Sequence, residues 1–172
     1  SANTSPVVTN GEVKTTPVQY DPNMYPTPKQ GGEDVSTATV IGSLPYQDFG
    51  TTAGYVDDYD ETCPYSGSTS PDVVYSYTPA ANMAIDLDLC GEGTLYDTKL
   101  DVYENSVTAG SPFACNDDAC SNSTTSYLSQ IVNLSLTSGN TYYIVVDGYG
   151  GASGDYELNV VENTTTPPPN DD

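Results

Sequence analysis

Two cysteines enclose four residues, two of them acidic, in the stretch ACNDDAC at Ala114–Cys120. This pattern could serve a redox pair, a soft-metal site, or a disulfide-stapled loop that offers oxygen ligands to a hard cation. A redox pair of the Cys-x-x-Cys type has two intervening residues and a positive environment that stabilises the thiolate. Neighbouring carboxylates disfavour a thiolate, so the redox pair is the weaker interpretation of Cys115 and Cys120.

The four cysteines leave two further possibilities, thiolate zinc and disulfides. Tetrahedral zinc would require Cys63 and Cys90 to converge with Cys115 and Cys120, which adds negative charge to an already acidic surface. Disulfides are typical of secreted, cysteine-containing chains. We therefore predict Cys115–Cys120, which closes a tight loop, and Cys63–Cys90, which joins the end of an acidic loop to the end of a neighbouring strand.

Oxygen ligands for a hard cation gather in two groups. The first group is expected on loops and comprises Glu33, Asp34, Asp57, Asp58, Asp60 and Asp72. The second is expected at strand ends and comprises Asp97, Asn116, Asp117, Asp118 and Asp147. Such ligands suit calcium, which takes six to eight oxygens in irregular geometry. Any single aspartate could be a solvated surface charge, but several together repel one another unless a cation neutralises them. We predict at least one calcium site, without EF-hand spacing.

The charge balance excludes several classes of function. The formal net charge is −21, histidine, arginine and tryptophan are absent, and the cations are Lys14, Lys29 and Lys99, which argues against nucleic acid as a partner. Without histidine, the Ser-His-Asp and Cys-His arrangements are impossible within this chain. Glycoside hydrolysis by paired carboxylates lacks arginine or tryptophan to orient a substrate. We predict that the chain is not an enzyme, and a small carboxylate-based hydrolase is the weakest hypothesis.

The expected location is extracellular or at the cell surface. The chain starts at Ser1 without methionine and has no apolar run long enough to span a bilayer, so we expect a mature secreted product without membrane insertion.

The composition of the sequence changes along its length and divides it into three segments. Residues 1–32 carry five prolines and are predicted to form an extended N-terminal arm. Residues 33–162 contain short β-rich runs bounded by Gly, Pro, Asn or Asp, and no helical period. Tyr142–Val146 is apolar throughout and should be a central strand. We predict an all-β fold, an antiparallel β-sandwich of jelly-roll type, followed by a Pro-rich tail at 163–172.

The chain has 15 tyrosines against 2 phenylalanines. These tyrosines could form a carbohydrate-binding platform, or they could fill the core with their rings while the phenol groups reach polar partners. We favour the structural role.

Several phrases together resemble a known family. The phrases ATVIGSLPYQDFGTTAG, SPDVVYSYTPA, YDTKLDVY, ACNDDAC and TYYIVVDGYGGASGDYELNV occur in this order. From Glu33 to Glu162 the chain resembles the bacterial pre-peptidase C-terminal domain, a secreted β-sandwich module usually found beside catalytic domains of exported hydrolases. The resemblance implies a small, often calcium-binding domain that is not itself an enzyme. It also supports calcium at the first acidic group. Residues 1–32 lie outside the family pattern, and no catalytic domain accompanies it.

The arm suggests a mode of assembly. Its short apolar steps, Pro6–Val8 and Val13–Tyr20, could add a strand to an exposed sheet edge. On a neighbouring subunit this contact would be head-to-tail and would build a filament. We predict a structural subunit of an extracellular calcium-binding filament, a homopolymer assembled by donation of the arm. The alternative is a calcium-binding accessory module of a secreted hydrolase, or its carbohydrate- or protein-binding module.

Overall fold

The computed structural model describes residues 30–60, 64–108 and 111–164. Within these ranges the chain forms strands and no helix, so no helix is available there to cross a membrane. The strands are β1 (Thr39–Val40), β2 (Tyr46–Thr51), β3 (Val73–Tyr77), β4 (Met83–Asp88), β5 (Thr98–Glu104), β6 (Ala114–Asn116), β7 (Gln130–Leu136), β8 (Tyr142–Gly148) and β9 (Asp155–Glu162).

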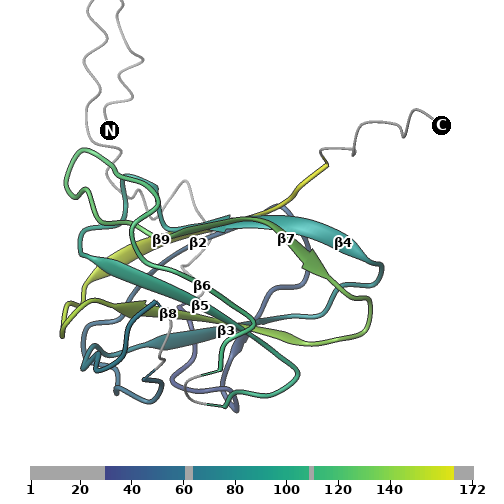
Figure 1. The fold of residues 1–172 in the computed structure, drawn as a ribbon, viewed down its shortest axis with the longest axis horizontal. Helices are drawn as coiled ribbons and strands as arrows, with labels where there is room; N and C mark the ends of the chain where they lie inside the picture. Colours follow the sequence, from purple (N-terminus) through teal and green to yellow (C-terminus); the bar gives the residue numbers. More distant parts are fainter. Residues whose placement is uncertain (1–29, 61–63, 109–110, 165–172) are drawn as a thin grey trace, which may run out of the picture.

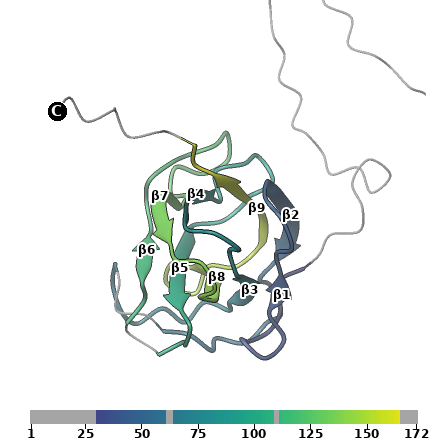
Figure 2. The same cartoon turned by 90° about the vertical axis from the view of Figure 1, so that its right-hand side faces the viewer.

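The strands build two sheets that pack face to face, as Figures 1 and 2 show. The five-stranded sheet has the order β1-β3-β8-β5-β6, and the four-stranded sheet has the order β2-β9-β4-β7. Neighbouring strands are antiparallel except β1, which pairs with β3 in parallel. The predicted all-β, antiparallel β-sandwich of jelly-roll type is therefore confirmed, and β8 is central in its sheet, as the apolar run Tyr142–Val146 predicts.

Two strands had no clear signal in the sequence. β2 combines polar residues with Gly50, and β6 is too short for a period-two pattern to be visible. Both are fixed by their partners, since β2 pairs along its whole length with β9 and β6 pairs with β5.

Aromatic and aliphatic side chains share the core between the sheets. Ile85 and Leu87 alternate with polar residues on β4 and point inward, which gives one wet face to the four-stranded sheet. Tyr75, Tyr142 and Tyr156 are fully buried beside them. The rings therefore fill the core, in agreement with the structural role predicted for the tyrosines.

The five-stranded sheet is buried on both faces. On β5, Leu100 and Val102 face the core, while the alternate residues Lys99, Asp101 and Tyr103 are equally buried on the other side. That second face is covered by the described parts of the segment between β2 and β3. There Tyr59 packs against the buried cluster that contains Tyr103, and the Lys99 ammonium lies over the Tyr65 ring. Polar groups on β5 are thus taken out of water without facing the core.

A candidate metal centre

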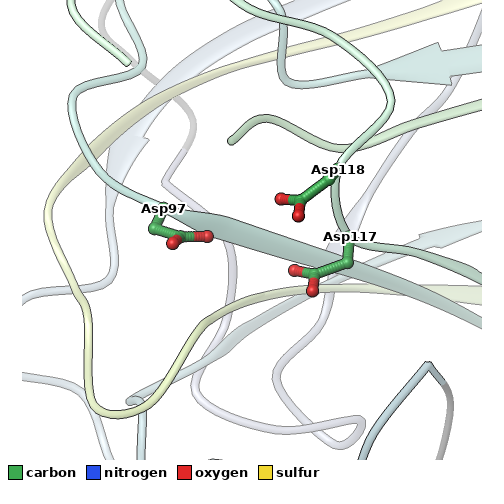
Figure 3. A group of neighbouring side chains, drawn as sticks. All are labelled: Asp97, Asp117 and Asp118. Atoms are coloured by element: carbon green, nitrogen blue, oxygen red, sulfur yellow. The ribbon is translucent and has the colours of Figure 1, made fainter. Parts of the chain in front are cut away.

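Three aspartates converge where β5 begins and β6 ends. Asp97 directly precedes β5, and Asp117 and Asp118 directly follow β6. Because β5 and β6 are antiparallel neighbours, with Leu100 opposite Asn116, the start of one strand lies beside the end of the other. The Asp97 carboxylate faces those of Asp117 and Asp118 (Figure 3), and one oxygen from each lies within 4.8 Å of the others. Among the described residues, no other three metal-ligating side chains meet this way.

The electrostatics of this cluster are unfavourable without a cation. Oδ1 of Asp97 and Oδ1 of Asp117 are buried and have no hydrogen-bond partner within the described ranges. The pKa of Asp117 is raised to about 6, first by burial and then by the charges of Asp118 and Asp97, while Lys99 opposes the rise. Burial and the charge of Asp118 also raise the pKa of Asp97. Partly buried carboxylates that repel one another are suited to a hard cation.

The backbone around the cluster is held in place from several sides. The Ser129 hydroxyl donates to the Asp117 carbonyl oxygen at 2.8 Å, and the Gln130 N–H donates to Oδ1 of Asn116 at 2.9 Å. Asn116 was expected among the metal ligands, but its side-chain oxygen serves to fix the end of β6 against the start of β7. The carboxylates of Asp117 and Asp118 are therefore presented from a restrained turn.

A disulfide joins the two segments that carry the cluster. Cys90 and Cys120 are bonded, with 5.9 Å between their Cα atoms, so the turn bearing Asp117 is tied to the segment that leads to Asp97. The predicted pairs Cys115–Cys120 and Cys63–Cys90 are therefore wrong. Cys115 is disulfide-bonded but to neither of these two, and Cys63 lies outside the described residues.

The pairing follows from which strands are neighbours. The backbones of Cys120 and Leu128 exchange two hydrogen bonds, while the Leu89 N–H donates to the carbonyl of Ser129. The consecutive residues Leu128 and Ser129 thus pair with Cys120 and with Leu89, the residue before Cys90. Cys115 instead lies within β6 opposite Asp101, so proximity in the sequence was the wrong criterion.

Asp147 was predicted in the same group but lies apart from the three converging aspartates. It is fully buried on β8 opposite Lys99, whose Nζ is 3.7 Å from its Oδ2. Its other oxygen accepts the N–H of Gly148 at 2.7 Å. The buried Lys99 was missed by sequence reasoning, although its place in the alternating run TKLDVY, between Thr98 and Leu100, was a signal for a residue on one face of a strand.

The first acidic group is spread over the loops beside β3 rather than gathered at one point. Glu33 accepts the Val56 N–H at 2.7 Å. Asp34 accepts the N–H groups of Ser36 and Thr37, and the hydrogen bond from the Ser36 side chain chiefly lowers the pKa of Asp34.

The remaining members order the segment that precedes β3. Oδ2 of the fully buried Asp72 accepts the N–H groups of Asp58 and Tyr59, and Asp60 accepts the Gly67 N–H. Burial raises the pKa of Asp57, and the charges of Asp60 and Asp58 raise it further. Metal binding by this group stays a prediction.

No family model matches the sequence, and no curated protein matches it. Among solved structures, the chain is similar to the pre-peptidase C-terminal domain of collagenase from Bacillus anthracis. The two are 20% identical with a TM-score of 0.46, over 71% of this chain and 92% of that chain.

Proposed function

We propose that residues 33–162 form a non-catalytic, calcium-binding accessory module of a secreted hydrolase. The observation that carries the proposal is the cluster of Asp97, Asp117 and Asp118, in which two buried carboxylate oxygens have no hydrogen-bond partner among the described residues, and a cation would supply one. Asp118 is exposed, so water can complete the six to eight oxygen ligands that calcium takes.

The donor set favours calcium over softer metals. The ligand atoms of the cluster are carboxylate oxygens, and the chain contains no histidine. The described cysteines, Cys90, Cys115 and Cys120, are all disulfide-bonded, so none of them offers a thiolate. Zinc and copper sites use imidazole or thiolate ligands, whereas carboxylates suit calcium, magnesium and manganese. Magnesium demands near-ideal octahedral geometry, which a cluster on two loops does not favour.

The accessory role is supported by the absence of histidine from the sequence and by the ordered phrases that resemble the pre-peptidase C-terminal domain. Bound calcium would supply positive charge between the start of β5 and the end of β6. The two carboxylates of Asp97 and Asp117 would then hold these strand ends together instead of repelling each other. At free calcium about tenfold above the dissociation constant, binding adds about 1.4 kcal/mol to the free energy of unfolding.

Thermal unfolding with calcium and with EGTA tests this proposal. We expect calcium to raise the midpoint of the wild-type protein and of Glu162→Gln, a control that removes an exposed carboxylate from the far end of β9. Asp117→Asn should lose the calcium-dependent rise. An unchanged wild-type midpoint contradicts calcium binding, whereas an equal rise in Asp117→Asn contradicts this site and points to the first acidic group.

Assembly into a filament stays a prediction. The arm that would be donated is residues 1–32, and residues 1–29 of it lie outside the described ranges. No contact among the described residues favours polymerisation over the accessory role.

A further inference from the structure

The side chain of Asn122 joins the two segments that carry the acidic cluster. Its Nδ2 donates to the carbonyl oxygens of Gly91 and Thr94, at 2.8 Å each. These two residues bound the turn between β4 and β5, in which the Thr94 N–H donates to the Gly91 carbonyl at 3.1 Å. Asn122 itself follows Asp118 on the segment between β6 and β7. One amide group thus connects the segment that leads to Asp97 with the segment that carries Asp118.

The oxygen of the same amide closes a turn on its own segment. Oδ1 of Asn122 accepts the N–H groups of Thr124 and Thr125 at 2.8 and 2.9 Å, and the Asn122 N–H donates to the Thr125 carbonyl at 3.0 Å. Because Nδ2 faces two acceptors and Oδ1 faces two donors, the amide cannot be turned over without losing all four side-chain bonds. The orientation of the Asn122 side chain is therefore fixed from both segments.

The segment that Asn122 reaches is itself anchored on the four-stranded sheet. The hydroxyl oxygen of the fully buried Thr94 accepts the Glu157 N–H at 3.0 Å, and the Leu95 N–H donates to the Asp155 carbonyl at 3.0 Å. Both partners belong to β9. The amide of Asn122 therefore ties its own turn to backbone that the sheet holds in place.

The sequence around Asn122 indicates a different role from the one that the contacts support. Asn122, Ser123 and Thr124 match the N-x-Ser/Thr signal for N-glycosylation. A glycan would replace one hydrogen of Nδ2, yet Nδ2 uses its two hydrogens for two backbone carbonyls. A sugar at this position would break the link between the two segments, so the structure favours the linking role over glycan attachment.

We propose that Asn122 is a positioning residue of the calcium site, an inference that rests on the proposed function. It holds the turn after β6 against the segment before β5, and so sets the separation between the carboxylate of Asp97 and those of Asp117 and Asp118 before the cation binds. The Cys90–Cys120 disulfide joins the same two segments at a second point. A site that is already arranged loses less conformational freedom when it binds its ligand.

Calorimetric titration of the full chain with calcium tests this role. Asn122→Ser keeps a short acceptor for the turn but is too short to reach Gly91 or Thr94, and we expect its calcium affinity to fall about 10- to 100-fold. Asn140→Ser is the matched control, because the Asn140 amide donates to Glu104 at the other end of β5, and its calcium affinity should equal that of the wild type. Urea unfolding in EGTA shows whether each variant is folded and measures any loss of stability separately.

Asn122→Asp is the second variant, and it decides the question if Asn122→Ser does not fold. It keeps the oxygen that accepts from Thr124 and Thr125 and loses both donors. Its added negative charge alone would favour calcium, so weaker binding by this variant supports the positioning role.

The outcomes separate this inference from the proposed function. Calcium affinity at or above the wild-type value in the folded Asn122 variants overturns the positioning role and leaves the calcium site standing. An equal fall in Asn140→Ser also overturns it, because the effect then follows from lost stability at any place in the fold. If the wild type binds no calcium, the proposed function is wrong and this inference fails with it.

Discussion

The ammonium of Lys99 lies 3.7 Å from the Asp147 carboxylate, and both side chains are fully excluded from solvent. They face each other across β5 and β8, on the side of the sheet away from the core, and the centre of the Tyr65 ring is 4.9 Å from Nζ. Lys99 also opposes the raised pKa of Asp117. One buried cation thus connects the covered face of the sheet to the candidate metal centre.

Lys99→Met should lower the free energy of unfolding by about 3–5 kcal/mol, because it leaves the Asp147 carboxylate buried without its cation. Urea unfolding measures the change. The double variant Lys99→Met with Asp147→Asn should recover much of the loss, since the uncompensated charge is then removed. If the single variant is as stable as the wild type, the buried pair contributes nothing to stability.

Removal of the Cys90–Cys120 disulfide should lower stability by about 3–4 kcal/mol, because the bond closes a loop with a sequence separation of 30. The double variant Cys90→Ala with Cys120→Ala is compared with the wild type in guanidinium. Peptide mapping without reduction checks the pairing itself: a peptide that links Cys115 to Cys120 would contradict the arrangement described here.

Calcium affinity should fall as the pH is lowered through the pKa of Asp117, which burial and neighbouring charges raise to about 6 in the folded protein. The metal requires the deprotonated carboxylate, so below about pH 6 each unit should cost up to about tenfold in affinity. Calorimetric titration at about pH 7 and about pH 5 measures this. Affinity that is the same at both values contradicts Asp117 as a ligand.

Without metal, the free energy of unfolding should depend on pH in the opposite direction. The contribution of Asp117 should then be more favourable at low pH than at high pH. Because the folded-state pKa is raised, the folded protein holds the Asp117 proton more tightly than the unfolded chain does. The destabilising contribution of Asp117 is therefore absent below about pH 4, grows as the pH rises and is complete above about pH 6. Unfolding in EGTA across this range, compared with Asp117→Asn, isolates the contribution; identical profiles would refute it.

Tyr75→Phe should destabilise the protein by about 1–3 kcal/mol, because it takes a donor from a buried carboxylate. The Tyr75 hydroxyl donates to Oδ2 of Asp48 at 2.9 Å and lies 2.7 Å from the Tyr156 hydroxyl. Tyr127→Phe is the matched control, since its ring is 55% exposed, and it should change stability by less than about 0.5 kcal/mol. Equal effects of the two substitutions would contradict the role of the hydroxyl network.

The strands of this fold were predictable where one side of the chain is apolar. Alternation in Met83–Asp88 and the apolar run at Tyr142–Val146 identify strands because burial imposes a period of two or a continuous apolar stretch. β6 was not predicted because its three residues are all half-buried and show no alternation. Its position depends on pairing with β5 rather than on its own composition.

The sequence predicted which residue types the candidate site would use, but not which of the predicted aspartates come together. Asp97, Asp117 and Asp118 were identified at strand ends, whereas Asp34 and Asp72, of the same type, accept backbone hydrogen bonds instead. Composition does not separate these roles, because the difference lies in which backbone groups are within reach. The same reason applies to Cys120, whose partner was set by pairing with Leu128 rather than by distance along the chain.

The pairing of β2 with β9 determines when the fold can be completed during synthesis. β2 ends at Thr51, yet its partner in the sheet begins at Asp155, and β9 also separates β2 from β4. When the chain emerges with its N-terminal end first, the four-stranded sheet therefore lacks an interior strand until β9 has emerged. Such long-range topology slows folding and favours a single late transition over stepwise assembly. A chain that ends before Asp155 should thus remain unfolded rather than form a smaller sandwich.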